Sequence, residues 1–561
     1  MRLPTIVSFA VLMIAPASGI GEAAPQDIAA PQPRVTSSPH RMCGDDVIAS
    51  GTARIMPGFG SGALVIATAK PRAQAFFDNG LQLSHAFAHA AGTAAFSEAA
   101  RIDPQCAMCR WGVAWSQGPT INYPIDAATQ VKLGKLVDSA IPLAATGPLL
   151  DRQMLAALAL RYRIGRPGAA DIAFARAMDG IARDHPDSDE ILTLAADAWM
   201  IPAALADDKQ GLPRAVALLE TVLKRTPDFT PAIHFYIHAT EMSGFPGRAE
   251  RYADRLGALA PAASHLIHMP SHTYYWVGRY QDAAVANVRA VAVGQADARA
   301  AKVPEPDGAF TQPYHAHNVH FGVGSALLAG DAQSALALSG PVLRRLARRS
   351  DAEPFGQMVG GMAYAAVGRF AEPVAVLGLP EPLEPMGYLR AYRHYARGEA
   401  YARMGDARAV RTEAAAIPKA AGPIGGADAS RQARNLMRIA KAVLNGRAAM
   451  IEQRYDLAIR AYADAARFDE DPSMAAFSDP PIWWYSPRRS LAAALLAAGK
   501  AQDALREVET ALRQRPRDPV TLSIRADVLR ALGQTAASER DRAAADATWH
   551  GDRSAFGPRL S

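Results

Sequence analysis

Three histidines, His265, His268 and His272, lie within the eight residues HLIHMPSH of a chain otherwise rich in alanine. A neutral imidazole is a common ligand of transition metals, and it also transfers protons near neutral pH. The stretch therefore indicates either a metal or catalytic site, or a polar patch on a scaffold that binds a partner. The positions of the other histidines bear on this choice.

Paired histidines recur at a fixed interval along the chain. His234 and His238 precede His268 and His272 by 34 residues. Spacings of three, four and seven residues place side chains on one face of a helix. Seven of the fourteen histidines belong to such sets, and a further pair four residues apart is expected to share the face of an earlier helix. The candidate metal ligands are His85, His89, His234, His238, His265, His268, His272, His317 and His320.

These residue types predict a transition-metal centre. Neighbouring helix axes lie roughly 8–10 Å apart, so imidazoles from facing helices can meet at one ion with bonds of about 2 Å. Three imidazoles with an open position suit Cu, Zn, Fe or Ni. Glu241 follows His238 by three residues and is our candidate catalytic residue, as a general base, although it could equally be a metal ligand or orient a histidine. Tyr274 and Tyr314 are candidate donors to a bound group.

The cysteines offer two interpretations. Cys106 and Cys109, in CAMC, form either a local disulfide, which we favour, or a ligand pair for the same metal. No histidine follows Cys109, which excludes covalent attachment of a c-type haem. Cys43 has no evident partner.

The N-terminus is typical of an exported protein. Residues 1–24 combine Arg2, an apolar run from Ile6 to Ile14 and a series of small residues, as a secretory signal peptide does. Residues 25–70 are rich in Pro, Gly, Ser and Thr, so we expect a flexible extension. No later run of about 18 apolar residues occurs, and we expect no stable membrane span. In a bacterium, export would make the protein periplasmic or secreted.

Composition narrows the fold and the partners. A chain of 561 residues is too long for one compact core. Half of the residues are hydrophobic, and abundant alanine favours closely packed helices. The net charge of +6 comes from scattered arginines, so we expect no nucleic-acid partner. The absence of HExxH, Gly-rich phosphate-loop and GxSxG motifs removes support for the common hydrolase and nucleotide-binding classes.

The chain carries an internal repeat. Aromatic, glycine, alanine and proline residues fall in the same frame near both ends, at Phe76, Gly80, Phe96, Ala99 and Pro104, and at Leu491, Gly499, Ala504, Ala511 and Pro516. This pattern resembles the tetratricopeptide repeat (TPR) family, whose unit is a helix, a turn and a helix. The resemblance implies an all-α TPR-type solenoid. We expect a TPR array over 71–340, degenerate helical repeats over 341–430, C-terminal TPR repeats over 431–550 and a tail over 551–561.

The resemblance also places the histidines. In TPR proteins the second, fifth, ninth and twelfth positions of the first helix line a concave groove, and seven of the candidate histidines and Glu241 fall on such positions. A peptide, a protein or a small molecule is the expected groove ligand. The chain also resembles exported bacterial TPR proteins with FFDQGL, CAMC, HMPSH and HN-HF signatures, for which we infer no chemistry.

Two irregular segments and one proline interrupt the array. The insertions at 298–314 and 470–487 are longer than TPR turns, and long loops are either disordered or functional. Pro270 lies inside an expected helix, where it would clash with the carbonyl of Leu266. We expect either a helix that starts near Pro270, with His265 and His268 on the entering loop, or a kink.

The leading hypothesis is an exported TPR solenoid with a histidine-rich transition-metal site in its groove. The site would serve redox or hydrolytic chemistry on a small molecule or peptide, or metal handling. The main alternative is a non-catalytic scaffold for protein–protein interaction, in which the histidines supply hydrogen bonds. A third is a groove that responds to pH, since unperturbed imidazole titrates near 6.5.

Overall fold

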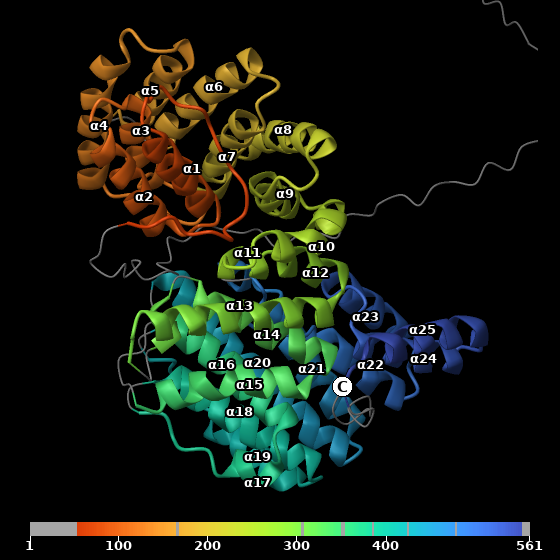
Figure 1. The fold of residues 1–561 in the computed structure, drawn as a ribbon. Helices are drawn as coiled ribbons and strands as arrows, with labels where there is room; N and C mark the ends of the chain where they lie inside the picture. The colour runs from red at the N-terminus through yellow and green to blue at the C-terminus, as the bar shows by residue number, and fades with distance from the viewer. Residues whose placement is uncertain are drawn as a thin grey trace, which may run out of the picture.

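The computed structural model is an all-α solenoid of the TPR type (Figure 1). It describes residues 53–163, 168–304, 308–312, 314–348, 354–383, 386–422, 424, 426–476 and 479–551. Within these ranges there is no β-strand, and no helix is long and apolar enough to cross a membrane. The predicted signal peptide and Cys43 both lie outside the described residues.

The helices are named here in chain order, in three consecutive groups. The first group comprises α1 (Pro71–His85), α2 (His89–Ile102), α3 (Ala107–Ser116), α4 (Ala127–Ala140), α5 (Leu149–Tyr162), α6 (Ala169–Asp184), α7 (Asp189–Ala206) and α8 (Leu212–Arg225). The second comprises α9 (Thr230–Met242), α10 (Glu250–Leu259), α11 (Ser264–His268), α12 (Pro270–Val277), α13 (Tyr280–Ala300), α14 (His315–Ala329) and α15 (Ala332–Leu346). The third comprises α16 (Pro354–Phe370), α17 (Pro373–Leu377), α18 (Gly387–Arg403), α19 (Ala407–Ala416), α20 (Ala427–Ile451), α21 (Tyr455–Asp469), α22 (Pro487–Ala497), α23 (Ala501–Gln514), α24 (Pro519–Ala531) and α25 (Thr535–Thr548).

Small residues let consecutive helices pack closely. Most helices lie against the next one along the chain, which is the arrangement of a repeat array. In the first pair, a Cβ atom placed on Gly80 would lie 2.7 Å from the Phe96 ring, so only glycine fits there. The spacing of Gly80 and Phe96 in the sequence thus corresponds to a direct contact between α1 and α2.

The apolar interior is divided into two cores that meet at α12 and α13. Tyr274 and Ala283 pack with the core built by α1 to α10. Tyr275 and Tyr280 pack with the core built by α14 to α24. Figure 1 shows α11 and α12 between these two parts of the molecule. The junction lies inside the segment 71–340, and the domain boundaries expected at 340 and 430 stay a prediction.

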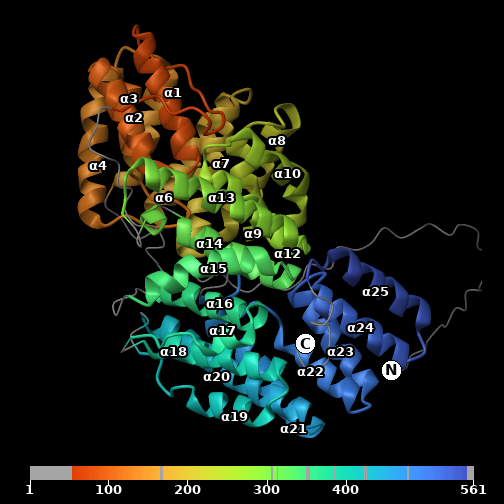
Figure 2. The same cartoon turned by 60° about the horizontal axis from the view of Figure 1, so that its bottom comes forward.

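The C-terminal repeats fold back onto this junction. The Tyr280 hydroxyl donates a hydrogen bond to the carbonyl of Pro516 at 2.7 Å, and the amide of His550 donates to the carbonyl of Ala329 at 2.9 Å. Figure 2 shows α23 to α25 beside the end of α12. A segment some 200 residues away in the sequence is thereby brought to the helices that carry the histidines.

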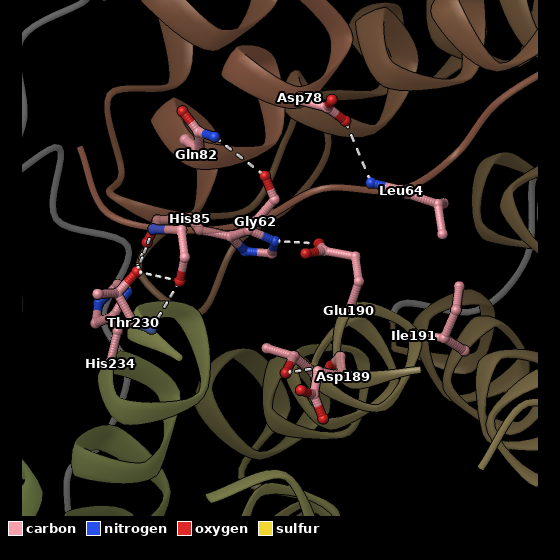
Figure 3. Close-up of polar contacts among 12 residues, drawn as sticks. Gly62, Leu64, Asp78, Gln82, His85, Asp189, Glu190, Ile191, Thr230 and His234 are labelled. Carbon is pink, nitrogen blue, oxygen red and sulfur yellow. Dashed lines mark hydrogen bonds and ion pairs between the residues drawn. The ribbon is translucent and has the colours of Figure 1, made fainter. Parts of the chain in front are cut away.

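Residues 53–70 differ from the flexible segment that we expected. They run as an extended strip along α1, with Leu64 and Ile66 buried. The amide of Ser61 donates to the Thr230 hydroxyl at 2.7 Å, and the amide of Leu64 donates to Asp78 at 3.3 Å (Figure 3). Side chains of α1 and α9 accept hydrogen bonds from the backbone amides of this segment. The segment is therefore ordered although its composition is rich in Gly and Ser.

Candidate metal centre

Six buried histidines from four helices meet at the junction of the two cores. Three come from α9 and α11, and their nitrogen atoms lie within 4.8 Å of one another: triad A, formed by His234, His238 and His265. Three come from α11, α12 and α14 and satisfy the same limit: triad B, formed by His268, His272 and His317. No ring is more than 8% exposed. They are enclosed, whereas the TPR resemblance implied an open groove.

The helix that carries three of these histidines is divided at Met269 into α11 and α12. The helical backbone continues through the break, since Met269 has φ −50° and ψ −38° and its amide donates to the carbonyl of His265 at 3.0 Å. As the first of the two expectations had it, a helix begins at Pro270, but His265 and His268 lie on the short helix α11 and not on a loop. His265 and His268 lie on α11 and His272 on α12, and the short helices direct His265 into triad A and the other two into triad B.

Hydrogen bonds fix the ring orientations in triad B. The Nδ1 atom of His268 lies 2.7 Å from Oδ1 of Asn287, and Nδ1 of His272 lies 2.9 Å from Oε2 of Glu241. Both oxygens only accept, so each Nδ1 carries the hydrogen and each neutral ring has its lone pair on Nε2. The two Nε2 atoms are 3.0 Å apart. Two lone pairs at this distance require a cation between them, either a proton or a metal ion.

Glu241 lies behind His272 and does not face the centre of the triad. Its Oε2 accepts from His272, and its Oε1 accepts from the indole Nε1 of Trp276 at 2.7 Å. With both oxygens engaged, the carboxylate is placed to orient a histidine that binds a metal. The catalytic role predicted for Glu241 stays a prediction.

A second carboxylate reaches His272 from the C-terminal half. Oδ1 of Asp479 lies 3.4 Å from Nδ1 of His272. Burial works against the charged ring, but attraction by Asp479 and Glu241 outweighs it and raises the pKa of His272 to about 9. Burial raises the pKa of Asp479 to about 7. The two carboxylates make this end of triad B attractive to cations.

The remaining predicted ligands lie apart from both triads. His320 bonds through Nε2 to the carbonyl of Pro480 at 2.9 Å, so it holds the residue next to Asp479. His85 bonds through Nε2 to Glu190 at 2.5 Å. The expectation that His85 and His89 share a helix face is wrong, because α1 ends at His85 and α2 begins at His89. The chain turns between them at Phe87, whose φ is +58°.

Cys106 and Cys109 are joined in a buried disulfide at the start of α3. This is the first of the two alternatives derived from the sequence. Within the described part of the chain, neither sulfur belongs to a group of residues that could hold a metal ion.

Sequence reasoning missed the residues that support the histidines. Asn287 gives no sign of its role in the sequence, because it contacts His268 only through the packing of α11 on α13. Asp479 lies in the long segment 470–487, whose length was the one available signal. Trp276 follows His272 by four residues, a spacing that predicts a shared helix face.

Acid should destabilise the metal-free protein. Burial lowers the pKa of His234 to about 3, and it lowers the pKa of seven other histidines, so these rings stay neutral when folded. The seven are His89, His238, His265, His268, His315, His317 and His320. Below pH 6.5 these histidines bind protons in the unfolded chain but not in the folded chain. The free energy of unfolding therefore falls as the pH falls.

The expected slope is about 1.4 kcal/mol per pH unit for each such proton, and several protons act together. The pKa of His272 is shifted in the opposite direction, so its protonated ring stabilises the folded state. This stabilisation is lost as the pH rises through about 9. Urea unfolding of metal-free protein should therefore show greatest stability between pH 6.5 and 9. A free energy of unfolding that is flat between pH 7 and 5 would contradict the neutral cluster.

The fold and the site together define an all-α TPR-type solenoid that encloses a histidine cluster. No family model matches the chain, and no curated protein matches its sequence. Among solved structures, the Naa15/Naa10 complex bound to HypK-THB is 13% identical over 87% of this chain and 90% of that chain, with a TM-score of 0.24. The human IFIT1 dimer with m7Gppp-AAAA is 13% identical over 79% and 90%, with a TM-score of 0.30. These likenesses assign no ligand or activity to this chain.

Proposed function

We propose that this chain is an exported solenoid protein that binds a transition-metal ion through triad B, for chemistry on a small molecule or peptide or for metal handling. One observation carries the proposal: the Nε2 atoms of His268 and His272 face each other at 3.0 Å while both Nδ1 atoms are engaged by oxygens. Nitrogen ligands favour Cu, Zn or Fe over Mg or Ca.

The surroundings of triad B support a metal rather than a packing role. Histidines that bind metals usually donate their second nitrogen to a carboxylate or carbonyl oxygen, which fixes the tautomer and raises the basicity of the ligand atom. His268 and His272 both have such a partner. Phe321 packs against both rings, with its ring centroid 5.0 Å from that of His268 and 4.6 Å from that of His272. Burial of the histidines excludes water from triad B, and charge interactions are stronger where water is excluded.

Export is part of the same proposal. The signal-peptide pattern of residues 1–24 and the likeness to exported bacterial TPR proteins with CAMC and HMPSH signatures support it. A disulfide at Cys106 and Cys109 persists in an oxidising compartment. Detection of the processed chain in the periplasmic fraction of a bacterial host tests this part independently of metal binding.

Glu241→Gln provides the test of the metal site. A glutamine can accept from His272 or from Trp276 but not from both, because its nitrogen would face a second donor. We expect the affinity of triad B for Zn²⁺ or Cu²⁺ to fall about 10–100-fold. The measurement is competition with a chromophoric chelator, on protein purified without a polyhistidine tag and stripped of metal.

Glu220→Gln is the matched control, since Glu220 accepts from the Tyr236 hydroxyl at 2.7 Å and takes no part in either triad. It should bind metal as the wild type does. Wild-type protein that does not compete with the chelator, or a Glu241→Gln variant with unchanged affinity, would contradict the proposal.

A further inference from the structure

The six histidines are too far apart as a set for one ion. Their nitrogen atoms form two separate groups of three, each within 4.8 Å. Bonds from a metal to nitrogen are about 2.0–2.1 Å long, so one ion reaches the nitrogens of one group. An ion in triad B therefore leaves triad A without a role.

Triad A resembles triad B in having one close pair of Nε2 atoms. Nδ1 of His234 donates to the carbonyl of His85 at 2.7 Å, which leaves the lone pair on Nε2 (Figure 3). That atom lies 3.1 Å from Nε2 of His265. The backbone carbonyl of His85 thus orients His234 as Asn287 orients His268.

The nitrogen atoms of triad A are not satisfied by the protein alone. Nε2 of His238 and Nδ1 of His265 are buried without a hydrogen-bond partner. A buried polar atom without a partner costs about 1–3 kcal/mol. An ion at the centre of triad A would accept the lone pairs of His234 and His238. Nε2 of His238 would then no longer be buried without a partner.

Two strained aromatic residues hold His265 in place. Phe87 and Tyr314 both lie in the left-handed region, with φ +58° and +59°. Their ring centroids are 4.8 Å and 4.3 Å from that of His265. Such conformations cost about 1–3 kcal/mol each in residues other than glycine, and they cluster at functional sites. Two of them on one imidazole indicate a built site rather than incidental packing.

We propose that triad A binds a second transition-metal ion, so that the chain holds a pair of ions side by side. The inference rests on the proposed function of triad B. The triads adjoin each other, because the ring centroids of His238 and His272 are 5.4 Å apart and those of His265 and His268 are 5.8 Å apart. Two ions about 3.5–4 Å apart act together on a bound oxygen ligand, so a small oxygen-bearing molecule is the ligand class that such a pair would take.

The test is the stoichiometry and magnetism of Cu²⁺ in the metal-stripped full chain. Wild-type protein should bind two ions, and its electron paramagnetic resonance should show coupling between them. The triad A variant His234→Gln with His238→Gln should bind one ion and give the spectrum of an isolated Cu²⁺. The triad B variant His268→Gln with His272→Gln should also bind one. Circular dichroism on each variant checks that the helices are intact.

The outcomes separate the two proposals. One ion in the wild type, lost in the triad B variant and kept in the triad A variant, would overturn the second site and leave the first. Two ions that persist in the triad A variant would also overturn it, because the second ion would lie elsewhere. No bound ion in the wild type would overturn both. Magnetic coupling between the two ions is measured on the wild type alone, so a poorly folded variant still leaves a readout of whether the ions lie side by side; two uncoupled ions would overturn the pair.

Discussion

Replacing His268 and His272 together with alanine is expected to lower the affinity of triad B for Zn²⁺ or Cu²⁺ by more than about 100-fold. Loss of one orienting hydrogen bond costs about 10–100-fold, and here two of the three ligands themselves are lost. His317 alone would remain, and one imidazole does not hold an ion against water. Equilibrium dialysis at a free metal concentration that saturates the wild type should show one ion fewer per chain.

The matched control for this variant is His315→Gln. His315 is buried on α14, as His317 is, but it belongs to neither triad. Its replacement should leave metal binding unchanged. Equal dialysis results for the wild type and the double alanine variant would exclude triad B as the site.

Asp518→Ala is expected to destabilise the C-terminal repeats by about 3–5 kcal/mol. Asp518 and Arg489 form an ion pair 2.9 Å long, and both side chains are 0% exposed. The guanidinium of Arg489 also lies over the rings of Tyr485 and Trp484, at 4.0 Å and 4.7 Å. Removal of the carboxylate leaves a buried positive charge without its counter-ion, which is the costly case.

Urea unfolding followed by circular dichroism measures this effect. Asp503→Ala is the control, because its pair with Arg506 is exposed and such pairs contribute about 0–1 kcal/mol. Replacing both partners, Arg489→Met with Asp518→Leu, should cost less than Asp518→Ala alone, since no charge is left unpaired. An Asp518→Ala variant as stable as Asp503→Ala would contradict the described core.

The C-terminal repeats also hold the segment of chain that carries Asp479, which lies beside triad B. Arg515 donates to the carbonyls of Trp483 and Trp484 at 3.1 Å and 3.4 Å, which holds the segment that follows Asp479. Asp479 in turn lies 3.4 Å from His272. The C-terminal repeats therefore place a carboxyl group beside a candidate site whose imidazole nitrogens all come from the middle of the chain.

The repeat frame predicted the fold and the six central histidines because both follow from local spacing. A 34-residue period relates His234 to His268 and His238 to His272, and a helix converts that period into a shared face. The same logic failed for His85 and His89, because a spacing of four gives no sign of a left-handed turn at Phe87.

The residues that support the site could not be predicted in this way. Asn287 and Asp479 reach their histidines through tertiary packing, and Asp479 lies more than 200 residues from His272 in the sequence. The strip at residues 53–70 was also misjudged, since its composition indicated a loose segment and hydrogen bonds to α1 and α9 hold it in place. Local patterns carry no information on contacts of this kind.

The most direct measurement of the central claim is the native metal content of the protein. The chain should be exported by a bacterial host, purified without tag or chelator, and analysed for Cu, Zn and Fe by mass spectrometry of the elements. We expect at least one transition-metal ion per chain, reduced in the His268→Ala/His272→Ala variant. Protein that carries no stoichiometric metal after growth with each of these metals in turn would contradict the account.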